Sequence, residues 1–493
     1  MTQTRWITLI LAVAALLRSL YLGKDGFWLD EFVTWQCTRD FGKVLTAEPS
    51  NPPFYYMLVF PWVELFGRSE IAFRSLSILP SLGSVFLAYW IGRRVISTPA
   101  GLCAAAYQAI SSFHIFYAQE ARAHAWLVFF LLSGSWLLLV ALDRKGFSQM
   151  RLLALYTIVM TIALYTHFIG IFFLAGHGVY VIALWLKSRD RESWRQLWQY
   201  SISLVLVLLF FSPWLIQMLK TAAAGGQVRR FLFLKPFQAY FSFLFGDSLV
   251  PFNESAVRNV VGTLKQYAPQ LAAAVLAAVL ILPFVWRAIQ RSKDKALFPL
   301  VMAIAPVLLC LLVSLKVMVF DERYMQTASP FLYMLLAAGM VEAWATRGPG
   351  RYAGLLSIAL FVILSALSLR NYYFDPQFGK EQWREVVAYV ESGGTPQTDL
   401  ILYEPEYLFA CFDYYKKGDI SGWRIFDPIA QEIVENRPEA WNKILGYKRV
   451  WLIRSHHRND VLLDALSKRM PVVNERNFDR GKGIDIHVFQ PGP

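Results

Sequence analysis

Long apolar segments recur along most of this 493-residue chain and restrict its fold more than any other feature. A helix needs about 20 predominantly apolar residues to cross a bilayer. Only 17% of the residues are charged, whereas soluble domains have roughly 25%. The sequence therefore predicts a membrane all-α bundle with about eleven transmembrane helices, at residues 6–22, 75–92, 97–116, 125–142, 152–166, 168–186, 199–219, 269–286, 296–315, 326–343 and 352–369.

The net charge of +13 is unevenly distributed. Residues 1–370 carry 32 basic and 17 acidic residues, whereas residues 371–493 carry 16 and 18. The basic excess lies in short joins that fall on the side of the N-terminus, at 93–94, 143–145, 187–195, 287–295 and 347–351. The positive-inside rule makes that side cytoplasmic. The pattern thus predicts a cytoplasmic N-terminus and places residues 371–493 outside, and it gives no support for nucleic acid binding.

The membrane domain, residues 1–370, is expected to have two long external loops, 23–74 and 220–268. Residues 54–66 are apolar but short and contain Pro61 and Glu64. If this segment crossed the membrane, the basic joins would fall on alternating sides, so we predict an interfacial or re-entrant helix. Two prolines stiffen its start, and Tyr55 and Tyr56 follow as candidate substrate-binding residues or simply as part of the helix start.

Beyond residue 370 the apolar runs shorten to strand length, as in 399–403, 449–453 and 484–489. Helix-like stretches lie between them, at 380–391 and 460–469. Alternation of short strands and helices is typical of an α/β fold. Residues 371–493 are therefore predicted to form a soluble, extracytoplasmic α/β domain.

Acidic residues collect on the predicted external side. Asp30 and Glu31 follow the first span and are flanked by aromatic residues. A carboxylate at the membrane boundary costs free energy unless it is paired or functional. Such a group can act as a general base that accepts a proton from an attacking hydroxyl. The alternative is a solvated loop with an aromatic belt.

A second external join contains Glu120, Arg122 and His124, and a very tight one contains His167. Arg122 and His167 are candidate substrate-binding residues. Helical spacing would place Glu120 and His124 on one face. The alternative to a functional role for Glu120 is a structural ion pair with an arginine. The alternative for His167 is a purely structural role. No metal site is assigned, although Glu31, Glu120 and His167 leave a divalent cation open.

Basic residues on the external side break the positive-inside pattern. Lys316 and Arg323 lie there, beside Asp321 and Glu322, and Arg74 precedes the second span. Arginine recognises phosphate through its planar fork of donors. These cations are candidates for binding a phosphate, and an internal ion pair with Asp321 or Glu322 is the alternative.

The ordered set of motifs carries a family resemblance. Over residues 1–345 it resembles the bacterial dolichyl-phosphate-mannose-protein mannosyltransferase-like group, glycosyltransferase family 39/83 of the GT-C superfamily, which includes the lipid A aminoarabinose transferase. The motifs are Trp28-Leu29-Asp30-Glu31, Asn51-Pro52-Pro53-Phe54-Tyr55-Tyr56, Phe66-Gly67, Phe73-Arg74-Ser75, Tyr117-Ala118-Gln119-Glu120-Ala121-Arg122, and Arg323-Tyr324 before Pro330.

The resemblance implies a glycosyltransferase in the bacterial inner membrane. It would transfer a sugar from a polyprenyl-phosphate donor to an extracytoplasmic glycan, lipid or protein, with inversion. Asp30 would be the general base and Glu31 its orienting neighbour, while Glu120 would position the base or the acceptor. Arg323 and Lys316 would hold the donor phosphate. At the start of the segment that leads into residues 54–66, the aminoarabinose branch has a Lys-Pro type of sequence, whereas this chain has Asn51-Pro52. The difference argues against an aminoarabinose donor.

Two other functions compete with this one. A flippase or transporter of lipid-linked sugars would need polar residues deep in the spans or broken helices in repeated halves, and the sequence shows no such repeat. A non-catalytic scaffold would not need a layer of acids and cations at the membrane boundary. The sugar and the acceptor are not specified by the sequence.

Overall fold

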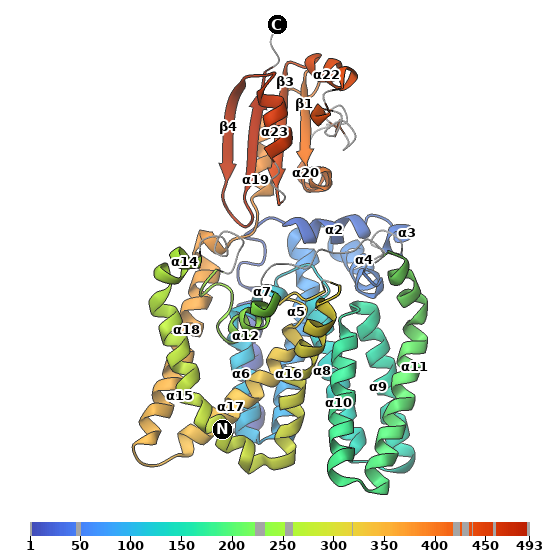
Figure 1. Ribbon diagram of the computed structural model, residues 1–493, viewed down its shortest axis with the longest axis vertical. Coiled ribbons are helices and arrows are strands. Elements are labelled where there is room, and N and C mark those ends of the chain that lie inside the picture. Colours follow the sequence, from blue (N-terminus) through green and yellow to red (C-terminus); the bar gives the residue numbers. More distant parts are fainter. Residues whose placement is uncertain are drawn as a thin grey trace. The chain divides into compact units, whose positions relative to one another are not determined.

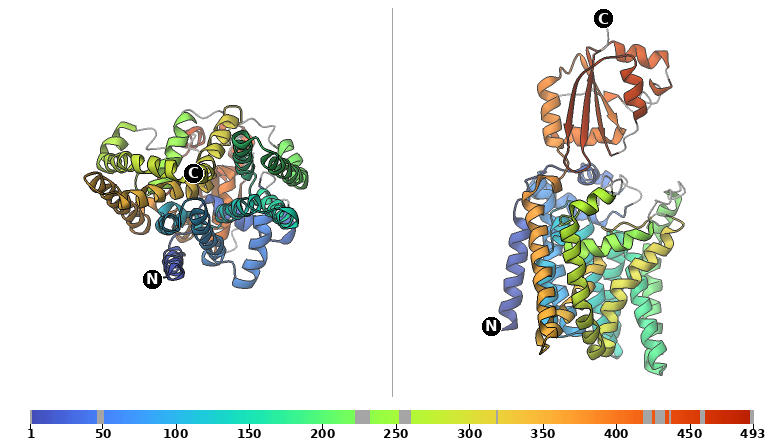
Figure 2. Two further views of the ribbon diagram at one scale, coloured as in Figure 1. Left: turned by 90° about the horizontal axis from the view of Figure 1, so that it is seen from below. Right: turned by 60° about the vertical axis from the view of Figure 1, so that its left-hand side comes forward.

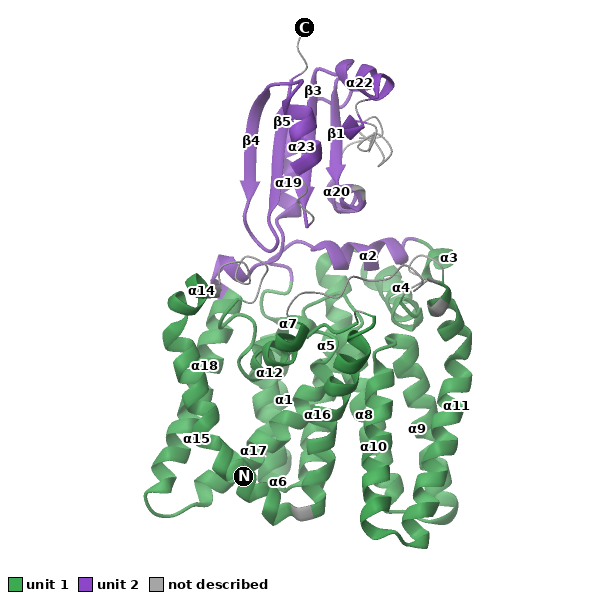
Figure 3. Ribbon diagram, viewed as in Figure 1, with its two compact units in different colours: residues 1–22, 40–373 green, residues 23–39, 374–493 purple. Residues whose placement is uncertain are grey.

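The computed structural model describes residues 2–45, 51–221, 232–251, 260–317, 319–417, 424–425, 433–435, 437–456 and 460–490. The chain forms two compact units (Figure 3). The membrane unit comprises residues 1–22 and 40–373, and the C-terminal unit comprises residues 23–39 and 374–493. The predicted external loop 220–268 lies partly outside the described residues.

Helices account for the membrane unit (Figure 1). Within the described residues, nine are long and apolar enough to cross a membrane. They are α5 (Glu70–Val95), α8 (His124–Leu142), α9 (Gly146–Thr166), α10 (Gly170–Ser188), α11 (Arg191–Thr221), α15 (Ala268–Ser292), α16 (Leu297–Ser314), α17 (Ser329–Ala345) and α18 (Gly350–Phe374).

The other two predicted spans correspond to shorter helices, α1 (Gln3–Ser19) and α6 (Thr98–Ile110). A break separates α6 from α7 (Ser112–Ala118). At this break the buried Arg18 of α1 donates to the carbonyls of Gln108 and Ala109, at 3.2 and 2.9 Å. The last carbonyls of a helix lack partners within it and attract a cation. Arg18 thus stabilises the end of α6 through its side chain.

The burial of each helix shows its place in the bundle. In the most apolar 18-residue stretch of α17, 72% is buried inside the protein, compared with 17% in the corresponding stretch of α11. Large side chains such as Val205 and Leu209 of α11 are exposed, which suits a lipid-facing helix. Inside the bundle, α5 and α6 approach closely at Gly92 and Gly101, where a Cβ on Gly101 would lie 2.6 Å from the Tyr89 carbonyl oxygen. Small residues permit this approach.

The five basic joins gather at one end of the membrane unit, where the N-terminus also lies (Figures 1 and 2). We call this end the basic end. The opposite end, called the α4 end, carries several short helices: α3 (Phe41–Val44), α4 (Phe54–Phe66), α7, α12 (Lys235–Phe245) and α14 (Val260–Gln266). The segment at 54–66 is a 13-residue helix packed against α5 and α9. Which end faces the cytoplasm stays a prediction.

The C-terminal unit contains a five-stranded sheet in the order β2-β1-β3-β5-β4. Its strands are β1 (Asp399–Glu404), β2 (Arg424–Ile425), β3 (Arg449–Ser455), β4 (Val472–Phe478) and β5 (Ile484–Phe489). Strands β2, β1 and β3 are parallel, whereas β5 and β4 are antiparallel to their neighbours. The helices are α2 (Leu29–Cys37), α19 (Trp383–Gly393), α20 (Phe409–Tyr415), α22 (Pro438–Leu445) and α23 (Asp460–Ser467).

The predicted fold class is confirmed: a mostly helical membrane bundle with a small α/β sheet region. The three predicted strands correspond to β1, β3 and β5. Strand β4 was not predicted, because its sequence is largely polar and six of its seven residues are exposed. An edge strand with so little apolar content lacks the alternating pattern that identifies a half-buried strand.

Candidate active site

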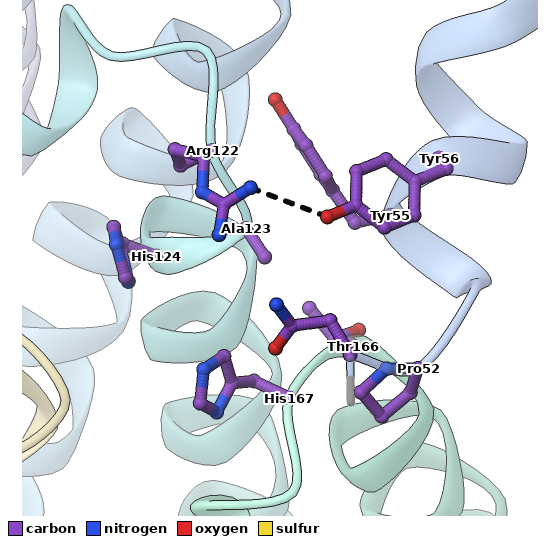
Figure 4. A pocket seen from close by; sticks show the side chains of 9 residues that line it. Pro52, Tyr55, Tyr56, Arg122, Ala123, His124, Thr166 and His167 are labelled. Carbon is purple, nitrogen blue, oxygen red and sulfur yellow. Dashed lines mark hydrogen bonds between the residues drawn. The ribbon is translucent and has the colours of Figure 1, made fainter. Parts of the chain in front are cut away.

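A cavity opens at the α4 end of the membrane unit (Figure 4). It lies between the start of α4, the bend at residues 119–123 and the tight join between α9 and α10. Four residues predicted to bind substrate meet here. The lining consists of Asn51, Pro52, Tyr55, Tyr56, Arg122, Ala123, His124, Thr166 and His167. The space open to the centre of a water molecule is about 10 Å³, roughly what one water needs.

One cation faces two tyrosines across this cavity. Arg122 donates through Nη1 to the Tyr56 hydroxyl at 3.2 Å. The Tyr55 and Tyr56 rings are 5.5 Å apart, and both side chains are buried. A guanidinium held among aromatic side chains is weakly hydrated and suited to binding a phosphate. The geometry therefore places a guanidinium in a cavity lined mostly by polar and aromatic side chains.

Glu120 is completely buried beside this cavity. Its carboxylate Oε2 lies 3.9 Å from His124 Nε2. Residues 119–123 form turns and bends rather than the helix expected from the spacing, and α8 begins only at His124. The Ser77 hydroxyl of α5 donates to the Glu120 carbonyl at 2.7 Å and holds this bend. Glu120 and His124 thus lie close together as predicted, but the backbone between them is a bend and not a helix.

Two buried histidines and the half-buried Tyr324 form a cluster next to Glu120. The His167 ring lies 4.7 Å from Tyr324 and 6.3 Å from His124. Burial, followed by the nearby cations Arg122 and Arg323, lowers the pKa of His167 to about 3. Its Nδ1 accepts from the Ile169 amide at 3.3 Å. The neutral ring therefore carries its proton on Nε2 and can donate a hydrogen bond.

The predicted phosphate ligands differ in their surroundings. Arg323 lies 3.4 Å from Asp321 and its guanidinium stacks 5.1 Å from the Tyr324 ring. Lys316 is exposed just beyond the end of α16. Arg74 is buried and donates to the Leu22 carbonyl at 3.0 Å. Arg323 thus adjoins the histidine cluster through Tyr324, whereas Arg74 holds the segment that follows the first helix.

A second acidic group lies at this end, beside α12 and after α16; sequence reasoning named Asp321 and Glu322 as ion-pair partners but missed Asp247. Glu322 pairs with Lys235 at 3.4 Å and accepts from Gln238 at 3.3 Å. Asp247 accepts from the Ser242 hydroxyl. The Asp247 side chain reaches solvent, yet surrounding protein desolvates it and, with Glu322 and Asp321, raises its pKa to about 7. In the sequence Asp247 looks like an ordinary loop residue.

Asp30 and Glu31 lie on α2 in the C-terminal unit. Glu31 is completely buried, and its Oε2 lies 3.0 Å from Lys380 Nζ and 3.4 Å from the Trp28 amide. Glu31 thereby caps α2 and neutralises Lys380. Asp30 is half-buried in the first turn of α2, where the helix dipole stabilises a negative charge.

The described part of the chain shows no group of three or more histidine, cysteine or acidic side chains arranged to hold a metal ion. Of the three residues considered for a divalent cation, Glu31 pairs with Lys380 and His167 Nδ1 accepts a backbone hydrogen bond. The four cysteines are free thiols. The geometry therefore gives no observation from which to assign a metal.

Comparisons with known proteins agree with this architecture. Residues 50–217 match the family model described as dolichyl-phosphate-mannose-protein mannosyltransferase, which confirms the predicted resemblance over that region. A search of curated proteins gives no significant match. The matched region contains Glu120 and Arg122 and the whole lining of the cavity.

Solved structures show the same fold over nearly the whole chain. ArnT from Cupriavidus metallidurans in the apo state matches with a TM-score of 0.61 and 14% identity, covering 98% of both chains. ArnT bound to undecaprenyl phosphate matches at 0.53 and 15%, covering 99% of this chain and 98% of that one. The Archaeoglobus fulgidus oligosaccharyltransferase complex with zinc and sulfate matches at 0.55 and 13%, covering 90% and 67%.

The fold and the comparisons together define a multi-pass membrane protein with the GT-C glycosyltransferase fold. Its bundle of membrane helices carries short helices and a buried group of polar residues at one end. Within the GT-C class, the matching family is that of the dolichyl-phosphate-mannose-protein mannosyltransferases, over residues 50–217.

Proposed function

We propose that this protein transfers a sugar from a polyprenyl-phosphate donor to an acceptor outside the cytoplasmic membrane, with inversion at the sugar carbon. The acceptor would be a glycan, a lipid or a protein. The observation that carries this proposal is the cavity at the α4 end, which combines Arg122 with two buried tyrosines beside the buried Glu120 and the neutral His167. The family match and the ArnT structure with bound undecaprenyl phosphate support the donor class.

Phosphate binding would begin with Arg122. One of its partners, the Tyr56 hydroxyl, is a neutral acceptor. A phosphate oxygen is a charge-assisted acceptor and forms a hydrogen bond about twice as strong. Because the cavity has room for only about one water, donor binding would require these side chains to separate. Arg323 would supply a second positive charge, and exposed Lys316 a third outside the cavity.

The chemical step would be a single displacement. Asp30 would accept the proton of the acceptor hydroxyl, whose oxygen forms a bond to the sugar carbon as the bond from that carbon to the phosphate oxygen breaks. The leaving phosphate would keep the electron pair, and the cations would stabilise its growing charge. Glu120 would position the acceptor and His167 would donate a hydrogen bond. Asp30 receives its role from the first-loop motif of the family.

The proposed location is the inner membrane of a bacterium. The basic end would face the cytoplasm according to the positive-inside rule. The α4 end and the C-terminal domain, residues 371–493, would be extracytoplasmic. A polyprenyl donor cannot leave the bilayer, so a site at the end of the membrane helices suits this substrate.

The test is transfer of radiolabelled sugar from polyprenyl-phosphate donors in membranes that contain the wild type, Asp30→Asn or Asp143→Asn. Asp143 lies at the basic end and is exposed, so it provides the matched control. We expect one donor to be consumed by the wild type and by Asp143→Asn, with transfer by Asp30→Asn reduced at least about 100-fold. If no donor is consumed but labelled lipid changes leaflet, the protein is a flippase instead.

A further inference from the structure

The segment that carries Asp30 is built into the C-terminal unit. Residues 23–39 belong to that unit although they lie early in the chain, between α1 and α3. Helix α2 has only nine residues, and an isolated helix of that length is unstable in water. Its conformation must therefore depend on contacts with the rest of the unit.

A buried ion pair provides the first contact. Lys380 Nζ lies 3.0 Å from Glu31 Oε2, with only 8% of the lysine side chain and none of the glutamate side chain exposed. Removal of one partner of such a pair leaves an uncompensated buried charge, which is strongly destabilising. Glu31 is the residue next to Asp30, so disruption of this pair acts directly on the first turn of α2.

Tyr415 of α20 provides the second contact. The Phe27 amide, just before α2, donates to the Tyr415 hydroxyl at 2.7 Å. A Cβ on Gly26 would lie 2.8 Å from the same hydroxyl oxygen, so a larger residue at this position would displace the Tyr415 hydroxyl. The Phe32 ring packs edge-on against Tyr415 at 5.8 Å, and Trp35 packs against Tyr414 at 5.4 Å.

The far end of α2 has a third contact. Arg39 Nη1 lies 3.3 Å from Asp413 Oδ2, and the Asp413 side chain is 8% exposed. The three contacts hold the helix before its first turn, within that turn and after its last turn. Such a distribution fixes the position and the rotation of a short helix, beyond merely attaching it.

We propose that the C-terminal unit positions the general base: Lys380 and Tyr415 are positioning residues that hold α2 so that Asp30 points in its reactive direction. This inference rests on the proposed role of Asp30 in sugar transfer. A displacement of about 1 Å of a reacting group can reduce a rate about 100-fold. The unit would then be a part of the catalytic apparatus, whatever acceptor the enzyme uses.

The experiment compares Lys380→Met, Lys380→Arg and the double variant Glu31→Gln/Lys380→Met with the wild type, all measured per folded protein. We expect Lys380→Met to lower kcat about 100-fold with the donor KM unchanged. Lys380→Arg should retain most of the activity. The double variant should recover part of kcat relative to Lys380→Met, because no lone buried charge remains. Tyr415→Phe should lower kcat by a smaller factor.

Arg454→Met is the matched control. Arg454 is also buried in the C-terminal unit and pairs with Glu404 at 2.7 Å and Asp460 at 2.8 Å. This variant should lose thermal stability and keep its kcat per folded molecule. If Lys380→Met behaves like Arg454→Met, the pair is merely structural and the inference is overturned.

Hydrogen exchange separates this inference from the proposed function. Amides of residues 29–37 should exchange at least about tenfold faster in Lys380→Met than in the wild type, and should be unaffected in Arg454→Met. Unchanged exchange in Lys380→Met overturns the inference whether or not the protein is active. A wild type that consumes no polyprenyl-phosphate donor overturns the proposed function, and with it the catalytic role assigned to this contact.

Discussion

The two ends of the membrane unit use the same types of charged residue in opposite environments. At the basic end, Lys187 pairs with Asp294 while their side chains are 54% and 62% exposed. Arg291 of the same end pairs with Glu342 at 2.6 Å and is 71% exposed. At the α4 end, Glu120 and His124 lie 3.9 Å apart with 0% and 3% of their side chains exposed. Both partners are withdrawn from water only in the second arrangement, since Glu342 of the basic end is 11% exposed but its partner Arg291 is largely exposed.

This difference separates topology from chemistry. Exposed ion pairs contribute roughly 0–1 kcal/mol and mainly keep the helix ends in water. Buried ionisable groups in a membrane protein cost free energy, so a group of them at one end of the helices is a candidate functional site. The same contrast is visible in the sequence, where Arg122, Lys316 and Arg323 depart from the positive-inside pattern that explains the other joins.

The largest expected effect is on kcat and comes from replacing a carboxylate at the α4 end, compared with the same replacement at the basic end. Glu120→Gln should lower kcat about 100-fold, because it removes the buried carboxylate that we propose positions the reacting groups. Glu192→Gln at the basic end, where Glu192 pairs with Arg195 at 2.5 Å, should leave kcat within about twofold. Steady-state kinetics with one donor measures both. Equal losses in the two variants would remove the functional distinction between the ends.

An intermediate effect is expected for the cations. Arg122→Gln should raise the donor KM about 10- to 100-fold, since a hydrogen bond between charged groups contributes about 1.5–3 kcal/mol. Arg291→Gln should leave KM unchanged because that guanidinium is exposed. Donor titration at saturating acceptor gives both constants. A fall in kcat at constant KM in Arg122→Gln would show that Arg122 acts only in the transition state.

The smallest effect concerns pH. Burial lowers the pKa of His167 to about 3, below the value of about 6.5 in an unfolded chain. Below pH 6.5 the unfolded state therefore binds a proton that the folded state does not, and stability falls as pH decreases, by at most about 1.4 kcal/mol per pH unit. His167→Gln should flatten the decline of the melting temperature in detergent between pH 7 and pH 5.

Lys187→Gln at the basic end is the control for this measurement. Its exposed ion pair should have little influence on the pH dependence. A wild-type slope in His167→Gln would mean that another group causes the decline. In that case the burial of His167 would make no measurable contribution to the pH dependence of stability.

Local sequence properties predicted most of the membrane unit. Hydropathy over about 20 residues identifies a span wherever it occurs, and the basic joins identified the ends of the helices. The break after α6 was not predicted, because residues 97–116 read as one apolar run; at the break, Arg18 of a distant helix donates to the carbonyls of Gln108 and Ala109. Strand β4 was also missed, because an exposed polar edge strand has no apolar pattern.

The candidate site was predictable only in part. Tyr55, Tyr56, Arg122 and His167 were identified individually from charge and aromatic motifs, and the structure brings them to one cavity. Asp247 was missed, since an acidic residue in a loop looks solvated until its neighbours are known. The pKa of about 7 for Asp247 arises from desolvation and from nearby Glu322 and Asp321, which are properties of the folded surroundings.

The sequence by itself determined that this is a membrane protein, where its helices approximately lie and which residues are candidates for function, because hydropathy, charge and motifs are local properties. Tertiary structure decided which of these residues meet. Phe27 and Tyr415 are 388 positions apart, yet their hydrogen bond assigns the segment around Asp30 to the C-terminal unit. No local pattern encodes such a contact, because it depends on the simultaneous packing of side chains that are remote in the chain.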